Sequence, residues 1–328
     1  MPADALSDLL KTVRLTGAVF FEVAARDPWV VESPPRDIIL SKVLPGADHL
    51  IAYHVVTQGR CFGSLAGGKP IPLEAGEVIM FTNADRHVMA SSPGMRSDPP
   101  PLSALEIATA GQLPFLMNYG GDGAPSTRLV CGYLACDARP FNPLLENLPP
   151  VIKVGNPKAG DAGWLGQFIR FAVMESAEKR AGSESVLAKL SELMFIEVVR
   201  RHLESLPPEQ AGWLAGLRDP FVGKALSLIH GKPAHDWTIE ELATKAGQSR
   251  SLFAKRFTDF VGMPPIQYLA KWRMQIASER LGSGTANLAT IAADIGYESE
   301  AAFSRAFKKL MGVPPSDWRR RARPVDRP

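Results

Sequence analysis

Short runs of apolar residues, parted by glycine, proline, asparagine or aspartate, characterise the chain from Gly17 to about Ile107. Such runs are typical of β-strands, and many short strands at close spacing favour a sandwich or a barrel. A further run from Thr127 to Ala135 predicts a closing strand. The earlier predicted strands are 18–23, 49–56, 61–65 and 77–81. We therefore expect the first part of the chain to be β-structure.

The hydrophobic period changes after Pro150 from that of a strand to that of a helix. Apolar residues between Trp164 and Met174 predict one helix, and those between Val186 and Leu203 predict a second that Ser183 can cap. The second helix is apolar over more than one stripe, so another surface must cover part of it. Packing against the barrel and a homodimer interface both remain open. Leu206-Pro207-Pro208 ends this helix and marks a linker.

Two pairs of short helices are predicted in about the last hundred residues. In the first pair, Gly247 ends one helix and Ser249 opens the next; in the second, Gly296 and Ser299 have the same roles. Two short helices around a tight glycine turn form a helix-turn-helix unit. A longer helix, from Pro265 to about Leu281 and roughly 25 Å long, joins the two units.

The second of these units is a near-copy of the first, fifty residues later in the chain. The register holds without slippage through two aromatic positions, a glycine, a Pro-Pro pair and a final aromatic residue. Phe253 maps to Phe303, Phe257 to Phe307, Gly262 to Gly312, Pro264-Pro265 to Pro314-Pro315, and Tyr268 to Trp318. The chain therefore contains an internal repeat.

The second helix of each unit is predicted to have one buried face and one free face. The expected inward residues are Leu252, Phe253, Phe257 and the stem of Arg256 in the first unit, and Phe303, Ala306 and Phe307 in the second. The outward face is basic with small polar residues between the cations, a composition that suits the DNA major groove. Candidate DNA-binding residues are Arg250, Ser251, Ala254, Lys255, Ala301, Ser304, Arg305 and Lys308. The alternative is a pair of ordinary helical hairpins with solvated charges.

The distribution of charge supports the DNA-binding interpretation. From residue 211 onward the chain has 18 Lys and Arg against 11 Asp and Glu, a net charge of +7. The remainder has 19 against 23, a net charge of −4, although the whole chain carries only +3. Basic character is therefore concentrated around the repeat, as a nucleic-acid surface requires.

The repeat resembles the paired helix-turn-helix domain of AraC/XylS-type transcription regulators. The resemblance rests on Ser249-x-x-x-Phe253-x-Lys255-x-Phe257, on Gly296-Tyr297-x-Ser299, and on Phe303-Ser304-Arg305-x-Phe307-Lys308-Lys309. The sequence departs from the family at Gln248, where an aliphatic residue is more usual. Membership implies double-stranded DNA, a small-molecule effector and RNA polymerase as partners.

The strand-rich part resembles a cupin, and its opening residues 6–21 resemble the cupin sensor domain of one branch of the same regulators. The segment from Asn142 to Pro150 resembles the motif at the exit of that sensor domain. His87 stands where cupins place the histidine of their second motif, and strand alternation puts His54 on the inner face. His54 and His87 are therefore the candidate effector-binding residues.

Catalytic cupins bind a metal through several histidines and a glutamate, because the ion needs three or more protein ligands. The His-x-His and the glutamate of the first cupin motif are missing from this chain. No metal and no other cofactor is therefore expected. The version of a metal site that stays open combines His87 with Cys61 or Cys131.

We expect an α+β protein of two domains. Residues 1–150 would form a cupin-like effector-sensing domain, 151–210 a helical coupling or dimerisation region with a linker, and 211–328 the DNA-binding domain. The N-terminus does not have the pattern of a signal peptide, and no run reaches the roughly 20 apolar residues of a membrane span. Three cysteines, an odd count, fit a reducing cytosol. The expected location is therefore the cytoplasm, with no membrane partner.

The sequence predicts a transcription regulator and not an enzyme. One alternative is a metal-dependent cupin enzyme fused to a DNA-binding domain, and another is a regulator whose barrel binds a protein partner. The identity of the effector, the target promoter and the choice between activation and repression stay open.

Overall fold

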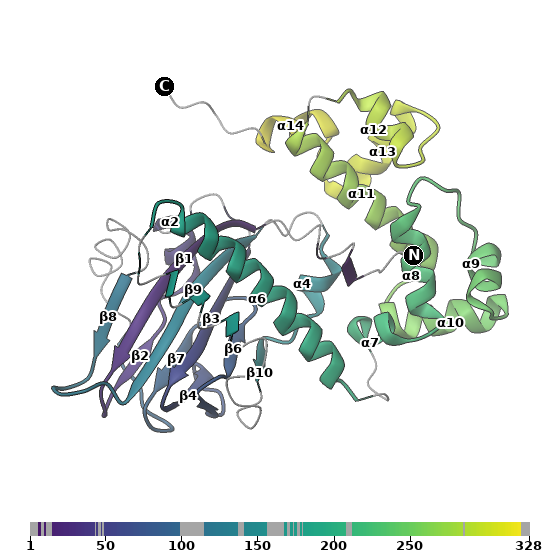
Figure 1. Cartoon of the computed structure of the whole chain (residues 1–328). Helices are drawn as coiled ribbons and strands as arrows, with labels where there is room; N and C mark the ends of the chain where they lie inside the picture. The colour runs from purple at the N-terminus through teal and green to yellow at the C-terminus, as the bar shows by residue number, and fades with distance from the viewer. Residues whose placement is uncertain are drawn as a thin grey trace. The chain divides into compact units, whose positions relative to one another are not determined.

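A computed structural model describes residues 15–42, 49–98, 115–136, 141–155, 180–207 and 212–322 without 285, and single positions within 6–10, 44–47 and 167–178 (Figure 1). Contacts divide the chain into two compact units. The sheet unit comprises 14–137 and 148–205, and the helical unit comprises 1–13, 138–147 and 206–328. This division differs from cuts at 150 and 210, because 138–147 is grouped with the helical unit and 151–205 with the sheets.

The sheet unit contains two β-sheets around one core. One sheet has the order β10 (Val151–Val154), β6 (Val78–Phe81), β3 (His49–Gln58), β9 (Thr127–Cys136), β1 (Leu15–Ala25) and β8 (Phe115–Tyr119). The other has the order β2 (Val30–Glu32), β7 (His87–Ala90), β4 (Arg60–Leu65) and β5 (Ile71–Glu74). Strands β1 and β8 pair in parallel and the other pairs are antiparallel. Buried residues of both sheets, such as Leu129 and Met89, belong to one hydrophobic cluster, as the barrel prediction requires.

The alternation of side chains in β3 explains how the long helix α6 (Ser183–Ser205) is covered. Leu50, Ala52 and Val56 face the core between the sheets. Tyr53, one position out of step, faces α6, and its hydroxyl lies 3.1 Å from Ser191 Oγ. Helix α6 lies along this outer face of the sheet in Figure 1. Packing against the barrel therefore covers one side of α6, while Leu193 on the other side is 49% exposed.

The predicted strands are confirmed in β1, β3, β4, β6 and β9. The expectation that helical structure begins directly after Pro150 is wrong, because β10 follows at once and pairs with β6. Alternation is hard to recognise in a four-residue strand, and the proline pair before it favoured a boundary. Residues at 167–175 are helical where described, as expected, but Trp164 lies outside the described residues. Strands β2, β7 and β8 and helix α2 (Arg36–Lys42) were not predicted.

The helical unit is built from short helices that match the predicted repeat. They are α4 (Pro143–Asn147), α7 (Trp213–Arg218), α8 (Val222–Gly231), α9 (Ile239–Ala246), α10 (Arg250–Val261), α11 (Pro265–Ser283), α12 (Leu288–Asp294), α13 (Glu300–Met311) and α14 (Pro315–Ala322). Helices α9 and α10 form the first helix-turn-helix, α12 and α13 form the second, and α11 joins them, as expected (Figure 1).

The register of the repeat is preserved in the structure. Helices α10 and α13 each have 12 residues and end at a left-handed glycine, Gly262 with φ 76° and Gly312 with φ 75°. The repeated phenylalanines, Phe253 and Phe257 in α10 and Phe303 and Phe307 in α13, are fully buried. Leu252, by contrast, is 53% exposed, so the prediction that it packs inward is wrong. Successive helix residues differ by about 100°, so the face that Phe253 and Phe257 bury turns Leu252 toward its edge.

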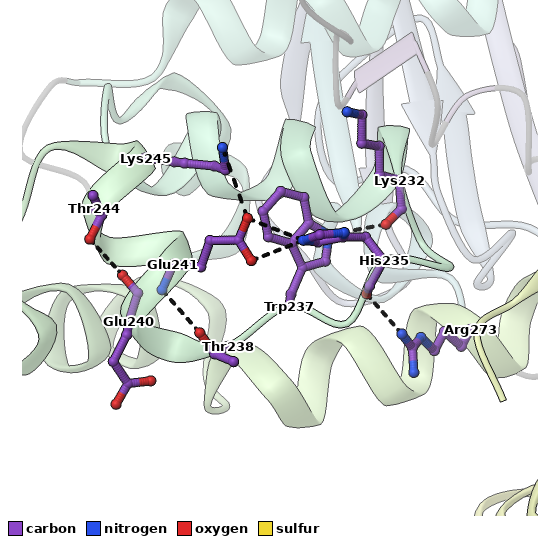
Figure 2. A network of polar contacts seen from close by, with 9 residues as sticks. All are labelled: Lys232, His235, Trp237, Thr238, Glu240, Glu241, Thr244, Lys245 and Arg273. Carbon is purple, nitrogen blue, oxygen red and sulfur yellow. Dashed lines mark hydrogen bonds and ion pairs between the residues drawn. The ribbon is translucent and has the colours of Figure 1, made fainter. Parts of the chain in front are cut away.

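Arg273 of α11 joins the first helix-turn-helix to the second. Its Nε and Nη2 donate to the carbonyl oxygens of Pro233 at 2.7 Å and His235 at 2.9 Å, and its Nη1 donates to Gly296 O at 3.3 Å. Figure 2 shows Arg273 reaching the loop before α9. In that loop the His235 ring contacts the Glu241 carboxylate at 2.9 Å. One guanidinium thus contacts the entrance of α9 and the turn after α12.

The two turn glycines provide a matched pair of stability tests. Gly247 and Gly296 have φ near +80°, so alanine at either should cost about 1 to 2 kcal/mol of unfolding free energy from backbone strain. A Cβ at Gly247 meets no atom within 4 Å, but at Gly296 it would lie 2.4 Å from Ala234 O and 2.8 Å from Arg273 Nη2. Gly296→Ala should therefore lower the urea midpoint of the helical signal clearly more than Gly247→Ala. Equal shifts would contradict this account of the turn.

Candidate nucleic-acid interface and barrel cavity

Helix α10 exposes three of its four candidate DNA-binding residues, while Phe253 and Phe257 are fully buried. Arg250, Ser251 and Lys255 are exposed, and Ala254 is half-buried. Arg250 Nη1 lies 2.9 Å from Glu240 Oε1, and Lys255 Nζ lies 3.5 Å from Asp259 Oδ2. Surface pairs of this kind are worth little in water. The cations can therefore leave their carboxylates for a polyanion at small cost.

Helix α13 presents the matching face, with Ala301, Arg305 and Lys308 exposed and Ser304 half-buried. Within the part of the chain that the structure describes, the side chains of Arg305 and Lys308 have neither a hydrogen bond nor an ion pair. Ser299 caps the helix by accepting from Ala302 N at 3.2 Å. Six of the eight sequence-predicted residues are thus exposed and two are half-buried, and among the described residues only the cations of α10 are in ion pairs.

Arg256 of α10 has a structural environment. Its Nε donates to Asp219 Oδ2 at 3.0 Å, and its guanidinium carbon lies 5.2 Å from the centre of the Phe221 ring. Asp219 Oδ1 also accepts from the backbone N–H groups of Phe221 and Val222 at the start of α8. Burial acts to raise the pKa of Asp219, but the hydrogen bonds from Arg256 and these amides outweigh it and lower the pKa. Arg256 therefore anchors α10 to α8.

The two candidate effector-binding histidines meet inside the sheet unit. His54 comes from β3 and His87 from β7, one in each sheet, and their Nε2 atoms lie 2.8 Å apart. His87 Nδ1 lies 2.7 Å from Asp85 O, and its ring stacks on Phe81 with 4.0 Å between centroids. The structure therefore brings together the two residues that the sequence selected.

The hydrogen bonds assign the protons of this pair. Asp85 O can only accept, so His87 Nδ1 carries a proton and the Nε2 of a neutral His87 accepts. His54 Nε2 must then donate, which leaves His54 Nδ1 without a proton. His54 Nδ1 is buried and has no hydrogen-bond partner among the described residues. The pair thus contains one buried acceptor that is unsatisfied in this structure.

Burial keeps both rings neutral. It lowers the pKa of His54 well below its ordinary value, and the neighbouring His87 lowers it further. Burial also lowers the pKa of His87 to about 4, against the opposing effects of Asp85 O and Glu32. At neutral pH the two imidazoles therefore form a neutral hydrogen-bonded pair.

His54 and His87 line a cavity of about 80 Å³, enough for several water molecules or a small ligand. Most of its wall is apolar or aromatic. These lining residues are Phe21, Val23, Trp29, Val31, Pro34, Met89, Met117, Tyr119, Leu129 and Tyr133. Glu32 also lines the cavity, but its carboxylate is held by Arg96 Nε at 2.9 Å and Arg86 Nη2 at 2.7 Å. The one carboxylate of this wall is therefore neutralised.

The donor set for a metal is weak in this cavity. Cys131 lines it with the two histidines, and burial raises the pKa of the Cys131 thiol and takes that of Cys61 to about 12. Thiols that stay protonated are poor ligands. Within the described ranges, no three side chains of His, Cys, Asp or Glu gather as a metal ion would require.

Several residues of these sites were not predicted. Glu32, Arg86 and Arg96 come from separate segments that only the folded sheets bring together. Arg256 was expected to contribute only its stem, whereas its guanidinium binds Asp219. At Gln248, where the sequence departs from the family, the side-chain Oε1 is buried and has no hydrogen-bond partner among the described residues.

Two family profiles match separate parts of the chain. The Cupin family matches residues 4–204, and a helix-turn-helix domain family matches residues 242–321. Among the described helices, none is long and apolar enough to cross a membrane.

Similar proteins are named as transcription regulators. A putative AraC-like transcription regulator of Streptomyces antibioticus is 34% identical, covering 98% of this chain and 100% of the relative. A second one, from Streptomyces lividans, is 32% identical over 97% of this chain and 98% of the relative. The DNA-binding domain of AdpA, solved with a target DNA, is 26% identical over 33% of this chain and 98% of its own, with a TM-score of 0.31.

Arg305, one of the exposed cations of α13, allows a test of DNA binding. Arg305→Ala should weaken binding to a selected DNA site by about 1 to 3 kcal/mol if the guanidinium makes a bidentate contact with a base. Titrations with single-base variants of the site would separate base contact from phosphate contact, because a phosphate contact gives a uniform loss. Lys255→Ala is the equivalent test in α10. Lys189→Ala, which removes one exposed cation of α6, is the charge-matched control, and an equal loss there would contradict the assignment.

The neutral histidine pair predicts acid sensitivity of the sheet unit. A folded-state pKa of about 4 for His87 means that the unfolded state binds more protons once the pH falls below about 6.5. Stability should therefore be complete above pH 6.5 and decline toward pH 4, by on the order of 3 kcal/mol for His87. Native-state hydrogen exchange of β3 and β7 at several pH values measures this loss. His87→Gln, which cannot titrate there, should flatten the profile; an unchanged profile would refute this origin.

Proposed function

Since the chain belongs to the AraC-type transcription regulators that carry an N-terminal cupin domain, we propose that a small molecule in the barrel cavity modulates its binding to DNA. The observation that carries this proposal is the neutral histidine pair in the wall of a mainly apolar cavity. A hydrogen-bonding group inside an apolar pocket can orient a ligand, because the surrounding wall excludes water.

We propose that α10 and α13 enter successive major grooves of one DNA duplex. The supporting observations are the common orientation of their basic faces relative to the buried phenylalanines and the single helix α11 between them. With 19 residues, α11 is about 28 Å long, close to the roughly 34 Å of one DNA turn. The proposed contacts are Arg250, Ser251, Ala254 and Lys255 in the first groove and Ala301, Ser304, Arg305 and Lys308 in the second.

The cavity favours an uncharged and mainly apolar effector. A carboxylate or an ammonium group would lose its hydration there, and burying an unpaired charge is costly. The wall offers no free counter-charge among its described residues, since Glu32 is paired with Arg86 and Arg96 and both histidines are neutral. A small polar group on the effector could instead donate to the unsatisfied nitrogen of His54 after a modest ring movement.

The remaining partners follow from this role. A regulator of this kind acts on chromosomal DNA with RNA polymerase, which places it in the cytoplasm. A second copy of the chain could cover the outer side of α6, where Leu193 is exposed. Phe171 and Met174, at 47% and 58% exposed, offer further apolar surface in the same unit.

Matched pairs of small molecules test the effector class. Toluene and octanol should raise the melting temperature of the full chain at concentrations where benzoate and octanoate do not, because only the neutral members avoid burying a charge. The double change His54→Ala, His87→Ala should abolish the effect of octanol, whose hydroxyl can hydrogen-bond to the pair, on DNA binding while leaving basal DNA affinity within a few fold. Arg305→Ala, which changes a residue outside the sheet unit, should retain the thermal shift. Stronger stabilisation by the carboxylates would rule out this class.

A further inference from the structure

The segment that connects β9 to β10 is packed within the helical unit. We call residues 141–147 the exit segment. It follows β9, which lines the cavity and ends at Cys136, and precedes Leu148, where the chain belongs to the sheet unit again. Its first five residues are buried. This is the motif Asn142 to Pro150 noted in the sequence, and neither the DNA contacts nor the cavity accounts for it.

The exit segment makes specific contacts with α11, the helix between the two helix-turn-helix motifs. Phe141 N donates to Gln275 Oε1 at 3.1 Å. The Phe141 ring meets Tyr268 edge to face, with 5.9 Å between centroids, and Lys271 Nζ lies 5.0 Å from the centre of the same ring. An amide, an aromatic edge and a cation thus recognise one phenylalanine.

Helix α4 gives the exit segment a defined shape. Asn142 Oδ1 accepts from the backbone N–H groups of Leu144 and Leu145 and so caps this short helix. Leu144 is fully buried, Leu145 is 5% exposed, and α4 packs against α7. The exit segment is therefore an ordered part of the helical unit's interior.

Tyr268 contacts both the exit segment and α10, the second helix of the first helix-turn-helix. Its ring is fully buried and meets Phe257 of α10 with 6.0 Å between centroids. Its hydroxyl lies 2.8 Å from His230 Nε2 of α8. Phe141 and Phe257 therefore touch the same tyrosine, and Phe257 is one of the two residues that set the rotation of α10.

Each end of the exit segment is linked to the cavity, one directly and the other through neighbouring residues. On the N-terminal side, Cys131 and Tyr133 of β9 line the cavity. On the C-terminal side, Thr82 N and Thr82 Oγ1 donate to Pro150 O at 3.2 Å and to Pro149 O at 2.8 Å. Thr82 follows Phe81, whose ring stacks on His87. The exit segment is thus connected to the cavity wall along the chain through β9 on one side, and through Thr82, Phe81 and His87 on the other.

We propose that the exit segment is the coupling element of this regulator, an internal ligand of the helical unit whose docking at Tyr268, Lys271 and Gln275 reports the state of the cavity. The inference rests on the proposed function of the barrel as a sensor. An effector that binds the docked and undocked arrangements unequally changes the support of α10 through Phe141, Tyr268 and Phe257. Thermodynamic linkage makes the coupling reciprocal, so DNA bound at the reading helices must also act on the barrel.

Reciprocity allows a test that needs no effector. Hydrogen exchange of the full chain is measured with and without a DNA site selected from a random library. In the wild-type protein, DNA should change exchange in α4 and in β9 by about 5-fold or more, the lower end of typical coupling. In Phe141→Leu, which keeps an apolar side chain but removes the ring, the DNA-induced change in β9 should disappear while DNA affinity stays within a few fold.

Lys271→Met provides a second variant, because it removes only the cation over the ring and leaves the buried core untouched. It should reduce the β9 response in the same direction even if Phe141→Leu were poorly folded. Lys189→Met on α6, an exposed lysine outside these contacts, is the control and should respond like the wild type.

An unchanged exchange pattern of β9 on DNA binding to the wild-type chain would overturn the coupling role, as would a full β9 response in both variants. Failure of the proposed function would look different. A chain that bound no DNA would fail at the selection step, and a cavity that bound no neutral ligand would show no thermal shift while the exchange result could still stand.

Discussion

The reading surface depends on one geometric constraint, which is that a helix with one face fixed in a core has only one rotation left. Two phenylalanines four positions apart fix that rotation in α10 and again in α13. Because both pairs are fully buried, the residues that face away from them are determined in both helices. A left-handed glycine ends each of these helices, and the guanidinium of Arg273 joins the two helix-turn-helix motifs. Chemistry at the outer face can therefore vary without changing where that face points.

The sequence made the reading helices predictable because the repeat supplies two independent copies of one pattern. The same reasoning failed at Leu252, where an apolar residue beside a buried face was assumed to share it. It also missed β10, since four residues after a proline pair show too little alternation to outweigh a change of period nearby. His54 and His87 could be selected by alternation and motif position. The arginines that neutralise Glu32 could not, because they reach it from segments 54 and 64 residues away in sequence.

The cavity and the exit segment show how polar groups are placed in otherwise apolar surroundings. Glu32 is paired with two arginines, and His87 is paired with Asp85 O and His54. His54 Nδ1, Trp29 Nε1 and Asn142 Nδ2 are buried without a partner among the described residues. An unsatisfied acceptor in a core costs free energy. The unsatisfied nitrogen of His54 thus lowers the stability of the sheet unit, and a hydrogen-bond donor at this nitrogen would remove that loss.

The unequal pairing of the basic faces has a consequence for the order of events on DNA. Arg305 and Lys308 have no partner among the described residues, whereas Arg250 and Lys255 sit beside Glu240 and Asp259. A face with unpaired cations attracts phosphates from a distance, while a face of ion pairs is nearly neutral until the pairs open. With the DNA contacts proposed above, the second helix-turn-helix would be suited to the first encounter with the duplex and to movement along it. The first unit is suited to engage late, at a site where base contacts replace its internal pairs, so the search and the final commitment would be divided between two copies of one motif.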